Sequence, residues 1–388
     1  MRVPTIILFF LLLLPVGSGA ATIRVEKDGS GDFTVIQDAV DAAEDGDTIE
    51  IGPGRFSDVH DFLYYGGFTT QVCVTLEKSL NIIGSGQGVT VITPANGFKT
   101  QSEPGGFASR SANLDVLLSD LTVENCPGNA ILFDMEFGGK LEMERVEVSN
   151  SFSGVVLKRT QNSRIHDCSF QTTGQSGVWA WNVVGLLVDD CFFQGHRGIL
   201  YYEALDSEIK NCRTENLTLG FSLSFCEGVT VSHCQLSDSS YRSLSLWGGN
   251  DILVHDVEAI DHSQAGLGLK HHSSMGEIEI RDSVFKGGEV TCYIDAPIPG
   301  LAFHNNHILP SDEGWTVWAT HDLYSGPDTW VSLTNNYWGT DVPGEVAASI
   351  HDGHDDEECH MFIFFEPMAG GPVGTNRTTL GGLKALFR

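Results

Sequence analysis

The feature that most constrains this chain is a repeat of about 22 residues. Ten segments align on it: LLSDLTV, LEMERVEV, SRIHDCSF, LLVDDCFF, SEIKNCRT, VTVSHCQL, ILVHDVEA, IEIRDSVF, LAFHNNHI and VSLTNNYW. Apolar and polar residues alternate within them, a pattern typical of strands with one buried face. One repeat is too short to bury that face alone, so neighbouring repeats must stack as coils of a solenoid.

Four columns of this alignment define the coil. Three of them are apolar or small and indicate the interior: Leu118, Met143, Ile165, Val188, Ile209, Val231, Val254, Ile280, Phe303, Leu333; then Leu121, Val146, Cys168, Cys191, Cys212, Cys234, Val257, Ser283, Asn306, Asn336; then Val123, Val148, Phe170, Phe193, Thr214, Leu236, Ala259, Phe285, Ile308, Trp338. The fourth is rich in Asp and Asn: Asp120, Arg145, Asp167, Asp190, Asn211, His233, Asp256, Asp282, Asn305, Asn335. Asp and Asn side chains bond to nearby backbone, so this column predicts a bend.

The segment before the first repeats, residues 22–56, predicts a cap over the open end of the solenoid. Ile36, Ala39, Val40 and Ala43 form the apolar stripe of a short helix, and Thr34 and Gln37 have the spacing of a capping box. A strand at residues 48–51 and a Gly-Pro-Gly turn follow. Because the exposed end of a solenoid must be covered, we expect this helix to cover it.

The nine cysteines allow two interpretations. Cys168, Cys191, Cys212 and Cys234 occupy one interior column, which favours a stack of buried free thiols. Disulfides between neighbouring coils are the alternative. The other five cysteines stand outside the column and show no pairing pattern.

Residues 1–21 have the composition of a secretory signal peptide, with Arg2 before a short apolar run and small residues after it. We therefore expect a secreted protein, extracellular or periplasmic, with no transmembrane segment. The net charge of −29 disfavours nucleic acid as a partner, since phosphates would be repelled. We expect a monomer with three parts: the signal peptide at 1–21, the solenoid at 22–368 and a flexible tail at 369–388.

Several segments carry a family resemblance. DGSGDFTVIQDAVDAA, GDTIEIGPGRF and SLNIIGSGQGVTVI resemble the start of pectin-lyase-like proteins, especially pectin methylesterases. NNYWGT, HDGHDD and FEP are similar to the last coil of exported bacterial β-helix proteins with no assigned activity. The resemblance implies an all-β fold, a right-handed parallel β-helix. The motifs QDTL, DFIFG and LGRPW of the esterases are absent, as are NTD and RIK of polygalacturonases, so no catalytic residue carries over.

A second strand in most coils points its alternate side chains outward, where enzymes of this fold bind substrate. Its segments are GVVLKR, GVWAWN, GILYYE, GFSLSF, SLSLWG and GLGLKH. The outward residues predicted to bind a sugar chain are Lys158, Trp179, Trp181, Tyr202 and Trp247. The alternative is that loops fold over this strand and bury the aromatic side chains.

The polar residues of this strand and of its end suggest chemistry on a uronic-acid polymer. Lys270, Arg159 or His271 could act as the base of a lyase. Glu203 or Asp295 could hold the substrate carboxylate through a bound Ca²⁺, the one cofactor that we consider. The competing interpretation of LGLKHHSSMG, residues 267–276, is a solvated turn without a catalytic role.

A second histidine-rich segment, HDGHDDEECH at residues 351–360, matches no zinc-binding spacing, so we expect it to be a structural turn. The sequence thus predicts a polysaccharide-interacting β-helix. It is either a lyase or a noncatalytic module that binds glycans or serves at a surface.

Overall fold

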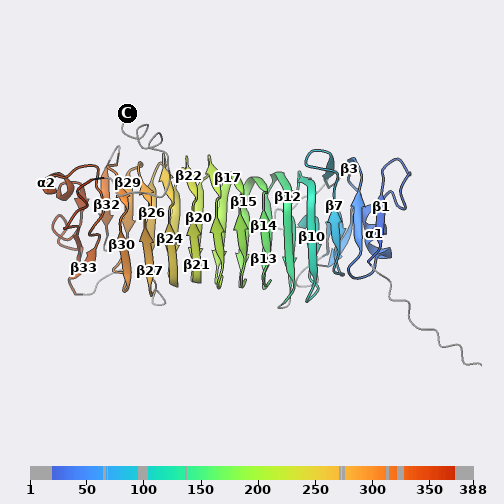
Figure 1. Ribbon diagram of the computed structural model, residues 1–388, viewed down its shortest axis with the longest axis horizontal. Helices are drawn as coiled ribbons and strands as arrows, with labels where there is room; N and C mark the ends of the chain where they lie inside the picture. The colour runs from blue at the N-terminus through green and yellow to red at the C-terminus, as the bar shows by residue number, and fades with distance from the viewer. Residues whose placement is uncertain are drawn as a thin grey trace, which may run out of the picture.

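The computed structural model describes residues 20–63, 67, 69–94, 104–135, 138–270, 272, 276–311, 314–320 and 327–371. Most of the expected signal peptide, most of the expected tail and His271 lie outside these residues. Figure 1 shows a rod in which the chain winds from one end to the other, with each coil beside the next. No helix among the described residues is long and apolar enough to span a bilayer.

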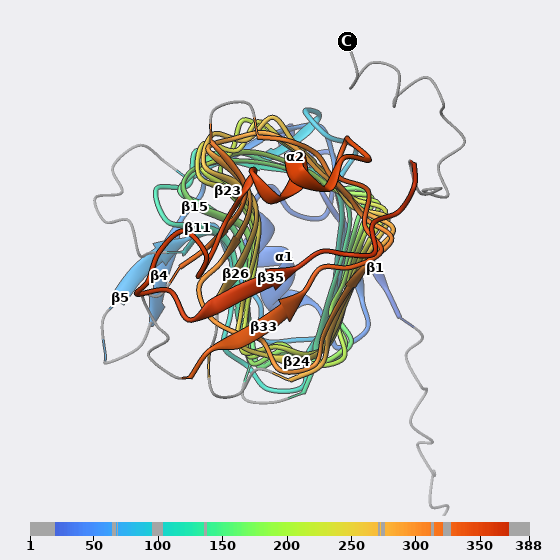
Figure 2. The ribbon, with the colours of Figure 1, turned by 90° about the vertical axis from the view of Figure 1, so that its left-hand side faces the viewer.

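Each coil contributes to three faces of parallel strands, as the view along the rod shows (Figure 2). The first face contains β1 (Thr22–Val25), β2 (Thr48–Ile51), β7 (Asn81–Ile83), the starts of β10 (Asp115–Glu124) and β12 (Lys140–Ser151), β14 (Arg164–His166), β16 (Leu187–Asp189), β18 (Glu208–Lys210), β21 (Glu227–Ser232), β24 (Asn250–His255), β27 (Ile278–Arg281) and β30 (Leu301–His304).

The second face follows after the bend. It contains β3 (Gly54–Phe56), β8 (Thr90–Ile92), the ends of β10 and β12, the starts of β15 (Ser169–Trp181) and β17 (Phe192–Tyr202), β19 (Arg213–Glu215), β22 (Gln235–Ser237), β25 (Glu258–Ile260), β28 (Val284–Phe285) and β31 (His307–Ile308).

The third face carries the second strand of the sequence repeat. It contains β6 (Val74–Thr75), β9 (Pro104–Ser109), β11 (Asn129–Asp134), β13 (Ser153–Lys158), the ends of β15 and β17, β20 (Leu219–Ser224), β23 (Arg242–Trp247), β26 (Ala265–Lys270), β29 (Val290–Ile294), β32 (Trp315–Ala319) and β34 (Ile350–His351).

The predicted interior columns are confirmed. Ile165 lies opposite Val188, and Phe170 lies opposite Phe193, as the alignment requires. Every side chain of the three columns is at most 4% exposed. Aromatic members stack along the rod axis, with the Phe170 and Phe193 ring centroids 5.1 Å apart. The solenoid core is therefore the continuous interior that the repeat predicted.

The Asp/Asn-rich column is confirmed as a bend between the first and second faces. All ten of its residues have positive φ, from 49° at Asp167 to 60° at Asn335. This left-handed conformation is unfavourable for most L-residues, and Asn and Asp tolerate it best. The column is rich in Asp and Asn for that reason.

The cysteine column is a stack of free thiols, as the first interpretation predicted. All nine cysteines are free and buried. The four aligned Sγ atoms bond to the carbonyl oxygen two residues earlier in their own coil, at 3.1 to 3.2 Å. Burial raises the pKa of the Cys168, Cys191 and Cys212 thiols. The same position holds Asn306 and Asn336 further on, whose side-chain amides also bond to carbonyl oxygens.

Both ends of the rod are covered. Helix α1 (Ile36–Ala42) lies across the N-terminal end, and Ile36, Ala39, Val40 and Ala43 are buried, as predicted. The capping-box prediction was wrong: Val35 is the N-cap without a side-chain hydrogen bond, and Gln37 Oε1 accepts a bond from Thr75 N at 2.8 Å.

Helix α2 (Pro343–Ala347) and a separate parallel sheet of β33 (Thr329–Ser332) and β35 (Met361–Phe364) lie at the C-terminal end (Figure 2). A hairpin of β4 (His60–Leu63) and β5 (Thr69–Val72) projects outside the third face near β11. The outer surface of the third face is thus covered by this hairpin at one end.

Candidate functional site

The outer surface of the third face has two columns of side chains, and the structure confirms both predicted registers. The first reads Val156, Trp179, Leu200, Ser222, Ser245, Gly268, and continues to Tyr293 and Trp318. The second reads Asp134, Lys158, Trp181, Tyr202, Ser224, Trp247, Lys270. Neighbouring members are one coil apart, about 4.8 Å along the rod.

The first column is closed at its N-terminal end. Phe62 and Val72 of the β4–β5 hairpin pack on Ala108, Leu132 and Val156, and all five are buried. Trp179 packs against this cluster and is half-buried. The predicted alternative, burial beneath a loop, therefore holds for this part of the face.

The first column is also closed further along. The Arg242 guanidinium lies 4.8 Å from the Tyr241 ring and 4.6 Å from the Tyr293 ring, and the residue is buried. A Cβ atom at Gly268 would stand 2.8 Å from Arg242 Cδ, so glycine leaves the room that this side chain needs.

The second column carries an exposed aromatic strip, which we define as Trp181, Tyr202, Phe225 and Trp247. Their ring centroids are 6.1, 5.3 and 5.3 Å apart in that order. Trp181 is 42% exposed, Tyr202 36% and Trp247 44%. The strip follows the rod axis across four successive coils, the first and last of which are three steps apart, or roughly 14 Å.

Phe225 belongs to the turn after β20, where its φ is 56°. A left-handed backbone is unusual for so bulky a side chain. This backbone conformation directs the Phe225 ring into the space over Ser224, between the rings of Tyr202 and Trp247. The sequence-based prediction missed Phe225 because the residue was assigned to the turn rather than to the outward column.

Two cations stand at the N-terminal end of the strip. Lys158 Nζ lies 3.6 Å from Asp134 Oδ2, and Arg159 Nη2 pairs with Asp134 Oδ1. The Asp134 side chain is fully buried. Lys158 Nζ also lies 5.8 Å from the Trp181 ring centroid and 6.0 Å from that of Trp179, which are cation–π distances. One buried carboxylate therefore pairs with two positive charges, and that of Lys158 lies beside two tryptophans.

The sequence-based prediction also missed Asp134. The signal was available in the alignment, because ILFD stands one coil before VVLK and places Asp134 opposite Lys158. Asp134 was passed over because it precedes the coils in which the small opening residue marks the second strand.

The family model described as "Right handed beta helix region" matches residues 105–259 and 176–322. The chain belongs to the right-handed β-helix family. No curated protein sequence matches it.

Several solved structures resemble this right-handed β-helix. The A-module of the Azotobacter vinelandii mannuronan C-5 epimerase AlgE6 is 16% identical, with a TM-score of 0.55 over 78% of this chain and 80% of that one. The periplasmic alginate epimerase AlgG is 11% identical, with a TM-score of 0.53 over 83% and 76%. A double mutant of the tailspike of E. coli bacteriophage HK620, in complex with a pentasaccharide, is 14% identical, with a TM-score of 0.61 over 81% and 65%. At these identities the likeness shows the fold alone.

The remaining predicted residues of this right-handed β-helix do not meet at one point. Lys270 lies opposite Trp247, five coils and about 24 Å from Lys158. His271 lies outside the described residues. Lys270 and Arg159 therefore cannot act on the same sugar ring.

The predicted carboxylates are also apart. Glu203 lies in the turn after β17 with φ 53°, and its Oε2 accepts a bond from Trp181 Nε1 at 3.4 Å. Asp295 is buried and follows Ile294, which lies opposite Leu269. It thus stands opposite Lys270, whereas the repeat pattern aligned it with His271, one position later. Glu203 orients Trp181, and the two carboxylates are four coils apart, which excludes one shared cation.

The histidine-rich segment 351–360 forms a structural turn. Asp352 Oδ1 accepts a bond from His354 N at 2.8 Å, and Oδ2 accepts one from Ile363 N at 2.7 Å. His360 Nδ1 lies 2.9 Å from Asp328 Oδ1 in a separate pair. Among the described residues, these histidines join no set of three candidate metal ligands.

Proposed function

We propose that the protein binds a polysaccharide along the third face, with the sugar chain parallel to the rod axis over the aromatic strip. The observation that carries this proposal is the unbroken series of ring contacts from Trp181 to Trp247. Sugar rings offer apolar C–H faces that pack on aromatic planes, and an exposed aromatic patch marks an interaction site.

The charges beside the strip favour an acidic sugar. Lys158 and Arg159 both pair with Asp134, and the Lys158 ammonium lies at cation–π distance from Trp181. A uronate carboxylate of a sugar chain on the strip would be attracted to these two positive charges. The chain as a whole has a net charge of −29, so such a local positive site is needed to hold an anionic polymer.

The names of the structural neighbours support the same substrate class. AlgE6 and AlgG are epimerases of mannuronan and alginate, and the tailspike structure holds a pentasaccharide. By the composition of residues 1–21, we place the protein outside the cytoplasm, where such polymers occur.

A lyase acting on a uronic-acid polymer is the second candidate function. The Lys158–Arg159 pair favours it, because cations that neutralise a uronate carboxylate make the neighbouring proton easier to remove. Lys270, the predicted base on the exposed column, stands about 24 Å from this pair, so proton removal by Lys270 needs a cation of its own. Arg159, an alternative predicted base, belongs to the pair and is engaged by Asp134. A bound Ca²⁺ would serve the same neutralising purpose.

The test measures binding and cleavage together on a panel of acidic and neutral polysaccharides, with and without Ca²⁺. We expect Trp181→Ala and Trp247→Ala each to weaken binding about fivefold to tenfold, as the loss of roughly 1 kcal/mol of ring stacking requires. Trp330→Ala is the matched control, because Trp330 is 62% exposed but belongs to β33 at the rod end. Equal losses in all three variants, or none, would contradict the proposed binding face.

Mass spectrometry of the same mixtures decides between the two candidates. Shortened products with an unsaturated end would establish the lyase, and their loss in Lys270→Ala, Arg159→Ala or His271→Ala would identify the base. Intact polymers together with Trp-dependent binding would establish a noncatalytic glycan-binding protein.

A further inference from the structure

A cluster of two histidines and an aspartate lies at the bend between the first and second faces. His233 follows β21, and His255 and Asp256 follow one coil later at the end of β24. One ligand atom from each residue can be chosen so that all lie within 4.8 Å of one another. Among the described residues this is the one set of three His, Cys, Asp or Glu side chains that meets this condition.

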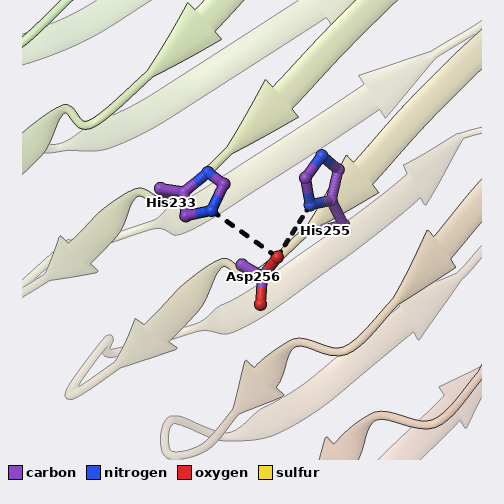
Figure 3. A group of neighbouring side chains, drawn as sticks. All are labelled: His233, His255 and Asp256. Carbon is purple, nitrogen blue, oxygen red and sulfur yellow. Dashed lines mark hydrogen bonds and ion pairs between the residues drawn. The ribbon is translucent and has the colours of Figure 1, made fainter. Parts of the chain in front are cut away.

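The side chains point toward one another (Figure 3). His255 Nδ1 lies 2.8 Å and His233 Nε2 3.8 Å from Asp256 Oδ2. The two imidazole ring centroids are 5.5 Å apart, with an interplanar angle of 83°. The backbone sets this arrangement, because His233 and Asp256 both adopt the left-handed conformation of the bend, with φ 54° at each.

Asp256 Oδ2 is bonded to His255, but the other oxygen of the Asp256 carboxylate is not satisfied in the described structure. Asp256 is 7% exposed, and its Oδ1 atom is buried without a hydrogen-bond partner in the described structure. A buried carboxylate oxygen without a partner is costly. Arg281, one coil further on, pairs with Asp282 at 2.6 Å and with Glu279 at 3.1 Å.

Neighbouring coils show what this column does elsewhere. Arg145 forms a two-pronged ion pair with Asp120 across one coil, at 2.7 and 2.8 Å. One position before this column, His166 lies 3.5 Å from Asp189, and the pair belongs to no set of three candidate ligands among the described residues. In these two cases one basic side chain meets one carboxylate, whereas at Asp256 two imidazoles approach the same carboxylate oxygen.

We propose that His233, His255 and Asp256 form a binding site for a divalent transition-metal ion of the zinc class. Two imidazole nitrogens and one carboxylate oxygen suit Zn²⁺, while Ca²⁺ requires six or more oxygens. The side chain of His233 is 48% exposed, so an ion can enter from solvent. Three protein ligands leave a coordination position for water or for an external group.

This site is independent of the polysaccharide proposal. It lies at the bend between the first and second faces, whereas the aromatic strip lies on the third. Loss of metal binding and loss of sugar binding can therefore be measured separately.

Titration of Zn²⁺ into the tag-free, chelator-treated full-length protein tests the site by calorimetry. We expect one equivalent to bind with a dissociation constant that is roughly micromolar or tighter. His233→Asn and Asp256→Asn should each weaken binding at least about tenfold, the loss that even outer-shell partners cause. Asn suits both positions because it tolerates the left-handed backbone. Circular dichroism verifies that the variants remain folded.

His166→Gln is the matched control for His255→Gln, because both histidines end a strand of the first face beside an aspartate. Binding should fall in His255→Gln and stay within about twofold of the wild type in His166→Gln. Absence of Zn²⁺ binding by the wild type would overturn the proposal, and so would equal losses in the two glutamine variants. Co²⁺ provides a further check, since a thiolate charge-transfer band in its spectrum would move the ion to the cysteines and overturn the assignment.

Discussion

One residue in every coil bends the backbone between the first and second faces through a left-handed conformation. Asp167 is a simple case, because it is exposed, has φ 49° and its side chain makes no hydrogen bond or ion pair in the described structure. Aspartate at this position therefore contributes through its conformational preference rather than through a contact. Histidine and arginine adopt positive φ less readily than Asp or Asn, so at this position they lower the stability of the fold.

Substitution of Asp167 isolates that preference. Asp167→Ala should destabilise the protein by about 1 kcal/mol, since alanine lacks the local bonds that make the left-handed region accessible. Asp167→Gly should stay within about 0.5 kcal/mol of the wild type, because glycine adopts positive φ freely. Urea denaturation followed by circular dichroism measures both.

Gln171 in β15 provides the inverse control. It is exposed on a regular strand, where glycine should be less stable than alanine. The same order of stability at Asp167 and Gln171 would contradict the role assigned to the bend.

At the scale of the element, buried thiols outside the aligned stack show how buried groups couple the coils to pH. Burial raises the pKa of Cys226 from the ordinary 9.0 to about 11, and that of Cys73 to about 12. The folded protein therefore keeps these thiols protonated in the pH range in which the same thiols of the unfolded chain begin to ionise. Each thiol contributes stability that is fully present below pH 9 and is lost as the pH rises toward the folded pKa.

Cys226→Ser removes one such thiol while keeping a polar group near the Ser224 carbonyl oxygen, which Cys226 Sγ approaches at 3.4 Å. Between pH 9 and 11 the free energy of unfolding should fall more steeply in the wild type, by up to about 1.4 kcal/mol per pH unit. Other ionising groups are common to both proteins and cancel in the difference. Parallel curves over this range would show that the Cys226 thiol does not titrate as described.

The columns were predictable from sequence because each coil repeats the same side-chain environment. Leu118 and its nine counterparts all lie inside, since period two fixes the face of every strand residue. Gln37 was not predictable, because its amide bonds to Thr75, which is distant in sequence. Asp295 was misplaced by one position because coil lengths vary, and only the pairing of Leu269 with Ile294 fixes it.

The candidate site was predictable in part for a similar reason. The columns placed Lys158, Trp181 and Trp247 correctly on the outside. Their exposure depended on where the β4–β5 hairpin packs, and nothing in the repeat encodes that position. His233 and His255 stand 22 positions apart in sequence, so the cluster with Asp256 could have been found by comparing neighbouring columns.

At the scale of the whole molecule, the rod is stable only if its ends are closed. Helix α1 covers the first coil with Ile36, Ala39 and Val40, and Lys78 Nζ bonds to the last carbonyl oxygens of the helix, including that of Ala43 at 2.6 Å. An uncovered end would present unpaired strand edges and an open apolar interior.

Val40→Asp should therefore cause self-association, because a buried, unpaired carboxylate would displace the helix from the end of the rod. Size-exclusion chromatography with light scattering measures the mass. Asp38→Asn, on the exposed side of the same helix, should behave as the wild type does. A Val40→Asp protein with unchanged mass would show that α1 is dispensable as a cover.

The bend also has an evolutionary consequence. Each residue of its column has a counterpart about 4.8 Å away in the coil before and in the coil after, whatever the side chains are. A single nucleotide change in this column therefore creates a new side-chain pair at a distance already set by the backbone, without any new loop. His233 and Asp256 are such a pair, and His255, one position before Asp256, completes the set of three side chains proposed to bind a metal.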